Sequence, residues 1–549
     1  MAAIGSTARR RRRGLLALAV LCAGLGVGMG AGLARRDAEA VVGEEAMRAE
    51  TDALAVAVGQ ARRVTARVDC ERKLVGPGEV RVASAAILRG GLAAGEADVD
   101  GKLFARLGLL PAGASYADLL AGAVARDPVG FYDPSARRLY VPSFIPLAVQ
   151  RPTLAHEIAH ALQDQRLGLR RFLKVTADGR RGLSFDGQLA RQALIEGDAA
   201  VLSMEAIEPR ATFPPPLAIA EMVQRARESV SDACQRPEHP NPQPAPDAAA
   251  PPASSTPARF LCELLAFPYV EGFAFVARVR GLATWAAVDG IWARPPESTA
   301  QILHPRRYDR RQGPLELELP PLPLFLLGDR FRLARTDTLG EVVVRSWLAA
   351  SGPAASARAG ASAEIADRAA TGWRGDRVAV YLPVAGDNGA GPDPLPDPPP
   401  RTGEGRLGGV TTPTGTGAIT LTPTPTPTGT ATGTPPPVPG AALAWLTAWD
   451  SEADADDFVQ NATVRLAALA AAGGAAEIGL PIDAVDHPAI WRERTGDSVF
   501  AVERRGALVA LLLGAPAAAV PSLGAMLEAS SPARLERLRR SRATRRDSR

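Results

Sequence analysis

The chain has 549 residues, enough to bury substantial cores, and its hydrophobic content of 46% is ordinary for a globular protein. Its formal net charge is only +4, and the positive excess is concentrated in Arg9–Arg13 and in the arginine-rich stretch 534–549. Because the residues between these ends carry a net negative charge, the composition argues against a nucleic-acid-binding surface.

The first 36 residues have the pattern of an export signal. Arg9–Arg13 precede an uncharged run from Gly14 to Ala34, which is just long enough to span a bilayer, and Arg35 follows. This order predicts a signal peptide or an N-terminal membrane anchor over 1–36, with the N-terminus in the cytoplasm. We therefore expect an extracytoplasmic protein, which is secreted, periplasmic or anchored to the membrane through this segment if it stays uncleaved.

The cysteines fit that compartment. Apart from Cys22 in the N-terminal segment, the chain has Cys70, Cys234 and Cys262. An oxidising compartment permits one disulfide, and we predict Cys234–Cys262, which flank a Pro/Ala-rich stretch over 236–258. That stretch has no core-forming pattern and is predicted to be a disordered insertion.

The residues before the central motif predict helices and then a hairpin. The pattern over 44–110 is mostly helical, and a short helix is expected over 116–125. Strand-like residues at 131–132 and 139–141, with Asp133-Pro134 as a turn, predict a β-hairpin. This hairpin is either the edge that binds an extended peptide by adding a strand, or an ordinary part of the core.

The motif His-Glu-x-x-His occurs at 156–160, in a chain with only five histidines. On a helix, His156 and His160 lie on one face and can direct two imidazoles at one metal ion, while Glu157 can accept the proton of an attacking water. We expect Pro152 at the first position of this helix. A pair of hydrogen-bonded structural histidines is the alternative.

A catalytic zinc site needs a third protein ligand. The metzincin pattern is excluded, since Gln163 and Arg166 stand where it requires glycine and histidine. A second helix is expected after Asp186 as N-cap, and Glu196 lies in the middle of its apolar face, where an unpaired carboxylate is costly. Glu196 is therefore the predicted third ligand, and a salt-bridged helical glutamate is the alternative.

Two aspartates are candidates to orient the predicted ligands. Asp164 follows His160 by one helical turn, and Asp198 could serve His156 in the same way. Either could equally be a solvated charge on its helix.

The C-terminal third predicts a smaller α+β module over 371–530. Its expected elements are strands at 377–382 and 442–449, a capping box at 451–454, a hairpin formed by 499–502 and 508–512, and a helix after Pro521. Two further helices are expected before it, at 338–350 and 361–370. The Pro/Thr/Gly-rich residues 386–440 are expected to be a linker inserted between two strands of one sheet, and 531–549 a basic tail.

Four motifs in this order carry a resemblance to a known family. They are His-Glu-Ile-Ala-His-Ala-Leu-Gln-Asp-Gln from 156, Glu-Gly-Asp-Ala from 196, Phe-Pro-Tyr from 267, and Ser-Thr-Ala-Gln-Ile-Leu-His-Pro from 298. Over roughly residues 100–385, and more weakly over 441–515, the chain resembles a family of bacterial extracytoplasmic proteins described as zinc metallopeptidases, and the Glu-Gly-x-Ala segment resembles the ligand helix of aminopeptidase-type gluzincins. Ala300 departs from the family pattern, so no role is carried to it.

The resemblance implies an α+β fold with a zincin-like catalytic core over 41–350. It implies that Zn²⁺ is held by His156, His160 and Glu196, that Glu157 is the general base, and that a peptide or protein is the substrate. His304 would be a further catalytic residue that stabilises the oxyanion or lines the cleft, or simply a histidine that ends a helix. The competing hypothesis is a catalytically silent, zinc-stabilised surface binding module, and the intact Glu157 argues against it.

Overall fold

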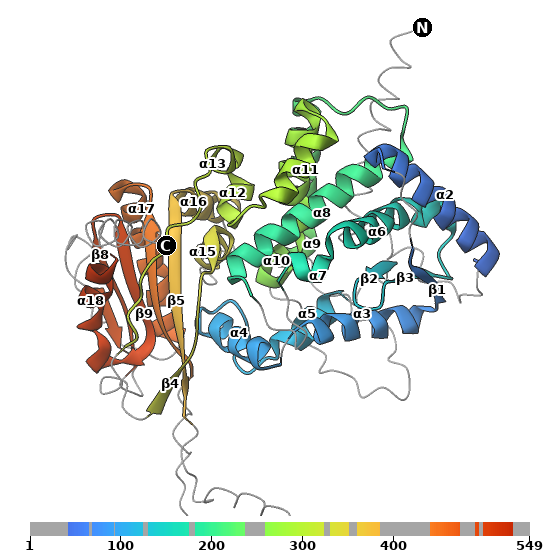
Figure 1. The fold of residues 1–549 in the computed structure, drawn as a ribbon. Coiled ribbons are helices and arrows are strands. Elements are labelled where there is room, and N and C mark those ends of the chain that lie inside the picture. The colour runs from blue at the N-terminus through green and yellow to red at the C-terminus, as the bar shows by residue number, and fades with distance from the viewer. Residues whose placement is uncertain are drawn as a thin grey trace, which may run out of the picture.

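The computed structural model describes residues 42–64, 69–92, 94–124, 130–174, 182–235, 259–322, 330–350, 359–384, 440–472, 489–492 and 498–530. The segments predicted at 1–36, 236–258 and 531–549, and all of 386–440 except its last residue, lie outside this part of the chain. Helices and two β-sheets make the fold a mixed α+β structure, as expected (Figure 1).

A group of packed helices forms the larger part of the molecule (Figure 1). Helix α8 (Phe185–Ile207) packs against α6 (Leu147–Leu167) on one side and α10 (Arg259–Leu282) on the other, and α2 (Glu44–Arg62) contacts both α6 and α8. Around them lie α3 (Pro77–Gly91), α4 (Ala94–Arg106), α5 (Tyr116–Val124), α7 (Leu169–Phe172), α9 (Pro216–Gln235), α11 (Trp285–Ala293), α12 (Thr299–Leu303) and α13 (Pro305–Asp309).

Helices α8 and α10 approach so closely that their backbones touch. A Cβ added to Gly197 would lie 2.1 Å from the carbonyl oxygen of Gly272, and one added to Gly272 would lie 2.0 Å from that of Ala193. Only glycine fits at both positions, because the atoms in the way belong to the backbone and cannot rotate aside. Because Glu196 directly precedes Gly197, this close contact fixes where Glu196 lies along the axis of α10.

The predicted disulfide is formed. Cys234 of α9 and Cys262 of α10 are bonded, with their Cα atoms 5.7 Å apart, and Cys70 is a free thiol. Helix α10 is also the one described helix long and apolar enough to cross a membrane, but 72% of its most apolar window is buried inside the protein. Its composition suits the core position that it occupies.

The predicted hairpin is confirmed, as part of a larger sheet. Strands β2 (Phe131–Asp133) and β3 (Arg138–Pro142) are antiparallel, and β1 (Glu71–Val75) pairs with β3 in parallel, so the order is β1-β3-β2. Strand β1 lies in a region that we expected to be mostly helical. Its short, half-exposed sequence carries little strand signal, and it becomes a strand because β3 offers a free edge.

The second sheet has six antiparallel strands in the order β4-β5-β6-β9-β8-β7. These are β4 (Phe331–Asp337), β5 (Trp373–Pro383), β6 (Ala442–Trp449), β7 (Ala489–Arg492), β8 (Ser498–Arg505) and β9 (Leu508–Pro516). Strands β5 and β6 are direct neighbours, which confirms that the stretch 386–440 connects two strands of one sheet. The sheet also includes β4, which lies within the range predicted for the catalytic core.

Helices cover both faces of this sheet. Alternate residues of β6 face opposite ways: Trp445 joins the main core with Trp347 and Phe458, while Leu446 joins a smaller core. On the main-core side lie α15 (Gly340–Ala349), α16 (Ala359–Thr371) and α17 (Glu452–Ala472), and α18 (Ser522–Ala529) closes the other side (Figure 1). The main core runs without interruption from the sheet into α6, the helix that carries the histidine motif.

Two predicted helix starts are wrong. Helix α6 begins at Leu147, so Pro152 lies inside it, and the extra turn is secured by the side chain of Gln150, which donates to the carbonyls of Pro142 and Ile145. The N-cap of α8 is Ser184, whose hydroxyl accepts from the N–H of Gly187, and Asp186 lies in the first turn. Half of the capping box is seen: the Ser451 hydroxyl accepts from the N–H of Asp454, while the Asp454 carboxylate accepts from that hydroxyl.

Candidate metal centre

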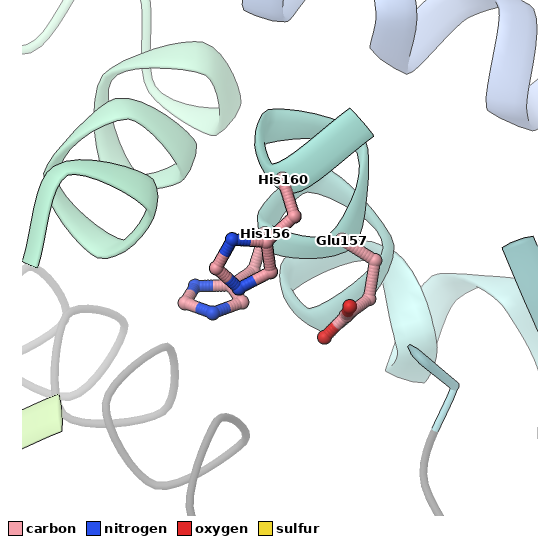
Figure 2. A group of neighbouring side chains, drawn as sticks. All are labelled: His156, Glu157 and His160. Carbon is pink, nitrogen blue, oxygen red and sulfur yellow. The ribbon is translucent and has the colours of Figure 1, made fainter. Parts of the chain in front are cut away.

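Helix α6 brings the two predicted histidine ligands together. His156 and His160 are 2% and 9% exposed, and their ring centroids lie 4.5 Å apart in an edge-to-face arrangement. Figure 2 shows both imidazoles projecting from the same side of the helix, with the carboxylate of Glu157 beside them. The three side chains form a group whose ligand atoms all lie within 4.8 Å of one another.

Glu196 reaches the same point from α8. One of its carboxylate oxygens lies 3.0 Å from Nε2 of His156 and 3.2 Å from Nε2 of His160. A tetrahedral zinc ion about 2.0–2.1 Å from each ligand holds its ligand atoms about 3.3 Å apart, so the three atoms have nearly the required separation. Two histidines and a glutamate are also a donor set that zinc accepts in catalytic sites. The residues therefore fit zinc.

Charge holds this group together. Burial lowers the pKa of His160, but the Glu196 carboxylate outweighs burial and raises that pKa to about 9. Burial raises the pKa of Glu196, and the two histidines reverse this and bring it to about 2. An ionised Glu196 thus lies against a protonated His160, and a metal ion would take the place of that proton.

Glu157 is positioned by the small sheet. The backbone N–H of Tyr132 on β2 donates to Oε2 of Glu157 at 2.8 Å, and the Tyr132 hydroxyl donates to Asp164 at 3.0 Å. Tyr132 therefore joins β2 to α6 at Glu157 and at Asp164, which lie about two helical turns apart. Burial raises the pKa of Glu157, against the opposing effect of the neighbouring histidines, so its carboxylate is a stronger proton acceptor than an exposed one.

Neither predicted aspartate orients a histidine. Asp164 accepts hydrogen bonds from Tyr132 and from the N–H of Leu169, and Asp198 accepts from the indole of Trp292 and lies 3.5 Å from Arg62. Asp198 therefore joins α8 to α11 and α2. The residue that contacts the ring of His160, as Asp164 was predicted to do, is Gln163, whose Oε1 lies 2.9 Å from Nδ1 of His160. Nδ1 of His156 is buried and has no partner within the described part of the chain.

Tyr269 is a site residue to which the sequence reasoning gave no role. It lies on α10, in the Phe-Pro-Tyr motif, with its ring stacked 6.1 Å from that of His156. Burial and the carboxylates of Glu196 and Glu157 raise its pKa well above the ordinary value, so it keeps its hydroxyl proton at neutral pH. Its place in the Phe-Pro-Tyr motif and its position as a polar ring in an apolar helix were the signals that could have marked it.

His304 ends a helix, as the second of its two predicted roles requires. It follows α12, and its Nε2 lies 2.7 Å from the carboxylate of Glu341 on α15. Helix α12 meets α8 where Thr299 donates to Asp186, and Asp186 precedes Glu196 by about 15 Å along the helix axis. His304 thus contacts α15, a helix that packs on the six-stranded sheet, whereas Tyr269 lies beside the histidine pair.

No protein-family model, curated protein or solved structure matches this chain.

Proposed function

We propose that the protein is a zinc-dependent metallopeptidase of the gluzincin type that hydrolyses peptide bonds outside the cytoplasm. The observation that carries the proposal is the convergence of His156, His160 and Glu196, from two helices, at separations that suit one zinc ion. Glu157 lies beside these ligands and is not needed to complete them, which is the placement that a general base requires.

Zinc bound by these three residues would supply a Lewis acid that polarises the substrate carbonyl. Glu157 takes a proton from the attacking water and passes it to the nitrogen of the scissile peptide, which leaves as an amine. The N–H of Tyr132 keeps the carboxylate in place during both transfers. The protonated hydroxyl of Tyr269 is suited to donate a hydrogen bond to the carbonyl oxygen as negative charge develops on it.

Strand β2 supports a peptide as the substrate. It is one of the two edge strands of the small sheet, and its backbone contacts the proposed catalytic glutamate directly. In a strand, the C=O of a residue points to the same side as its N–H, so the Tyr132 carbonyl also faces away from β3. An extended peptide that pairs with this edge would pass the metal centre.

The disulfide supports a location outside the cytoplasm. Bonds such as Cys234–Cys262 persist in oxidising compartments and are rare in the cytosol. The charge pattern of the N-terminal segment agrees with export.

The test of this function is the substitution Glu157→Gln, which keeps the size of the side chain and removes the base. The variant should fold, bind about one zinc per chain, and lose peptide hydrolysis by roughly a hundredfold or more. His156→Ala should lose metal and activity together. Glu221→Gln, an exposed glutamate on α9, is the matched control and should leave both unchanged.

Metal content and cleavage of a broad peptide library are the two measurements. Equal activity of the wild type and Glu157→Gln would rule out this mechanism. A wild type that binds zinc, cleaves nothing and binds a partner equally well after Glu157→Gln would instead be the zinc-stabilised binding module.

A further inference from the structure

Gln163 connects the two helices that carry the metal ligands. It lies one turn after His160 on α6 and is 5% exposed. Its Oε1 lies 2.9 Å from Nδ1 of His160, and its Nε2 donates to the carbonyl of Ile195 at 3.0 Å. Ile195 directly precedes Glu196, so one amide group contacts the second ligand and the peptide group that joins Ile195 to the third.

This arrangement fixes which way the amide faces. The carbonyl of Ile195 can only accept a hydrogen bond, so the NH₂ group of Gln163 must point toward it and Oε1 toward His160. An amide oxygen also only accepts, so Nδ1 of His160 must carry the hydrogen. In the neutral imidazole, Nε2 then presents its lone pair toward Glu196.

We propose that Gln163 is the positioning residue of the metal centre: it selects the tautomer of His160 that binds zinc through Nε2, and it sets the spacing between His160 and Glu196. This inference rests on the proposed function. A neutral amide performs the task without adding negative charge beside the metal, unlike the carboxylate that often holds a ligand histidine, and so leaves the Lewis acidity of zinc undiminished.

The test compares zinc affinity in four forms of the full chain: wild type, Gln163→Leu, Gln163→Glu and Gln165→Leu. Gln163→Leu removes both hydrogen bonds and should weaken zinc binding about 10–100-fold, as the loss of such outer partners does elsewhere. Gln163→Glu can still accept from Nδ1, so its affinity should lie closer to that of the wild type. Gln165→Leu is the matched control on the same helix, because the Gln165 amide nitrogen has no partner among the described residues.

The dissociation constant for zinc is measured by competition with a chromophoric chelator, after the unfolding temperature has shown that each variant folds. A second reading uses protein labelled with ¹⁵N in its five histidines. In the zinc-loaded wild type and Gln163→Glu, the His160 signals should show a protonated Nδ1 and a metal-bound Nε2. In Gln163→Leu this pattern should be lost or mixed with the other tautomer.

Two failures can be told apart. If the wild type binds zinc and Gln163→Leu matches Gln165→Leu in affinity and in its ¹⁵N pattern, Gln163 has no positioning role although the metal centre stands. If the wild type itself binds no zinc, the proposed function fails as well.

Discussion

His160 and Glu196 make metal binding depend on pH. The pKa of His160 is raised to about 9 from an ordinary 6.5, so the ion pair stabilises the metal-free protein fully below about pH 6.5 and progressively less toward pH 9. We expect the unfolding temperature of the chelator-treated protein to fall over this window. Glu196→Gln removes the partner charge, so the difference in unfolding temperature between the two proteins should shrink as pH rises.

Zinc affinity should move the opposite way. The ion must displace the proton of His160, so affinity should rise with pH up to about 9 and then level off. A zinc affinity that stays flat between pH 6.5 and 9 would contradict the assignment of His160 as a ligand that is protonated in the metal-free protein.

Two neighbouring carboxylates on α8 should behave differently. Glu196→Gln removes a charged ligand and should weaken zinc binding by about tenfold or more. Asp198→Asn removes the buried negative charge that faces Arg62. It should therefore lower the free energy of unfolding by up to about 3 kcal/mol while zinc stays bound. Metal content and chemical denaturation measure the two effects. Loss of metal on the Asp198 change, with metal retained on the Glu196 change, would reverse the assignment.

At the scale of the elements, α8 and α10 cross so closely that neither Gly197 nor Gly272 has room for a Cβ atom. Gly272→Ala places a methyl group against the Ala193 carbonyl, and we expect it to lower the free energy of unfolding by about 1–3 kcal/mol or more. Gly290→Ala on α11 is the control, since nothing lies within 4 Å of the added carbon, and it should raise stability by about 0.5–1 kcal/mol.

Denaturant unfolding and zinc affinity check both variants. Because Tyr269 and Glu196 flank the crossing, Gly272→Ala should also weaken zinc binding, and Gly290→Ala should not. Equal stability of the two variants would mean that the helices can separate without cost.

For the whole molecule, the long segment between β5 and β6 should be dispensable. Tyr381 pairs with Ala442, so the strand ends lie side by side and a short loop can join them. Since the entropy of closing a loop grows only logarithmically with its length, replacing 386–440 by a short Gly/Ser loop should leave the melting temperature and zinc content nearly unchanged. A large loss of either would show that the segment contributes to the fold.

The six-stranded sheet and the metal-site helices belong to one hydrophobic core. Trp347 of α15 packs against Trp445 of β6, with ring centroids 5.3 Å apart, and α15 also contacts α8. Strand β4 enters the sheet from the part of the sequence assigned to the catalytic core. Burial of both halves against each other explains why patterns along the chain could place the strands but could not show that they share a core.

The sequence by itself determined what local chemistry controls. The spacing of His156 and His160 fixed their common face through helix periodicity, strand-like residues on either side of a turn identified the hairpins at 131–141 and 499–512, and Cys234 and Cys262 were the pair that flanked an insertion. Only the tertiary structure decided which residues from other elements surround the histidines. The sequence predicted Glu196 as a ligand, and the glycine crossing of α8 and α10 brings it to the histidines together with Tyr269, which had no predicted role. The backbone of Tyr132 contacts Glu157, and Gln163 contacts His160 in place of the expected Asp164, which faces Tyr132. Such contacts depend on how two helices are rotated and translated against each other, and backbone atoms of distant residues set that geometry.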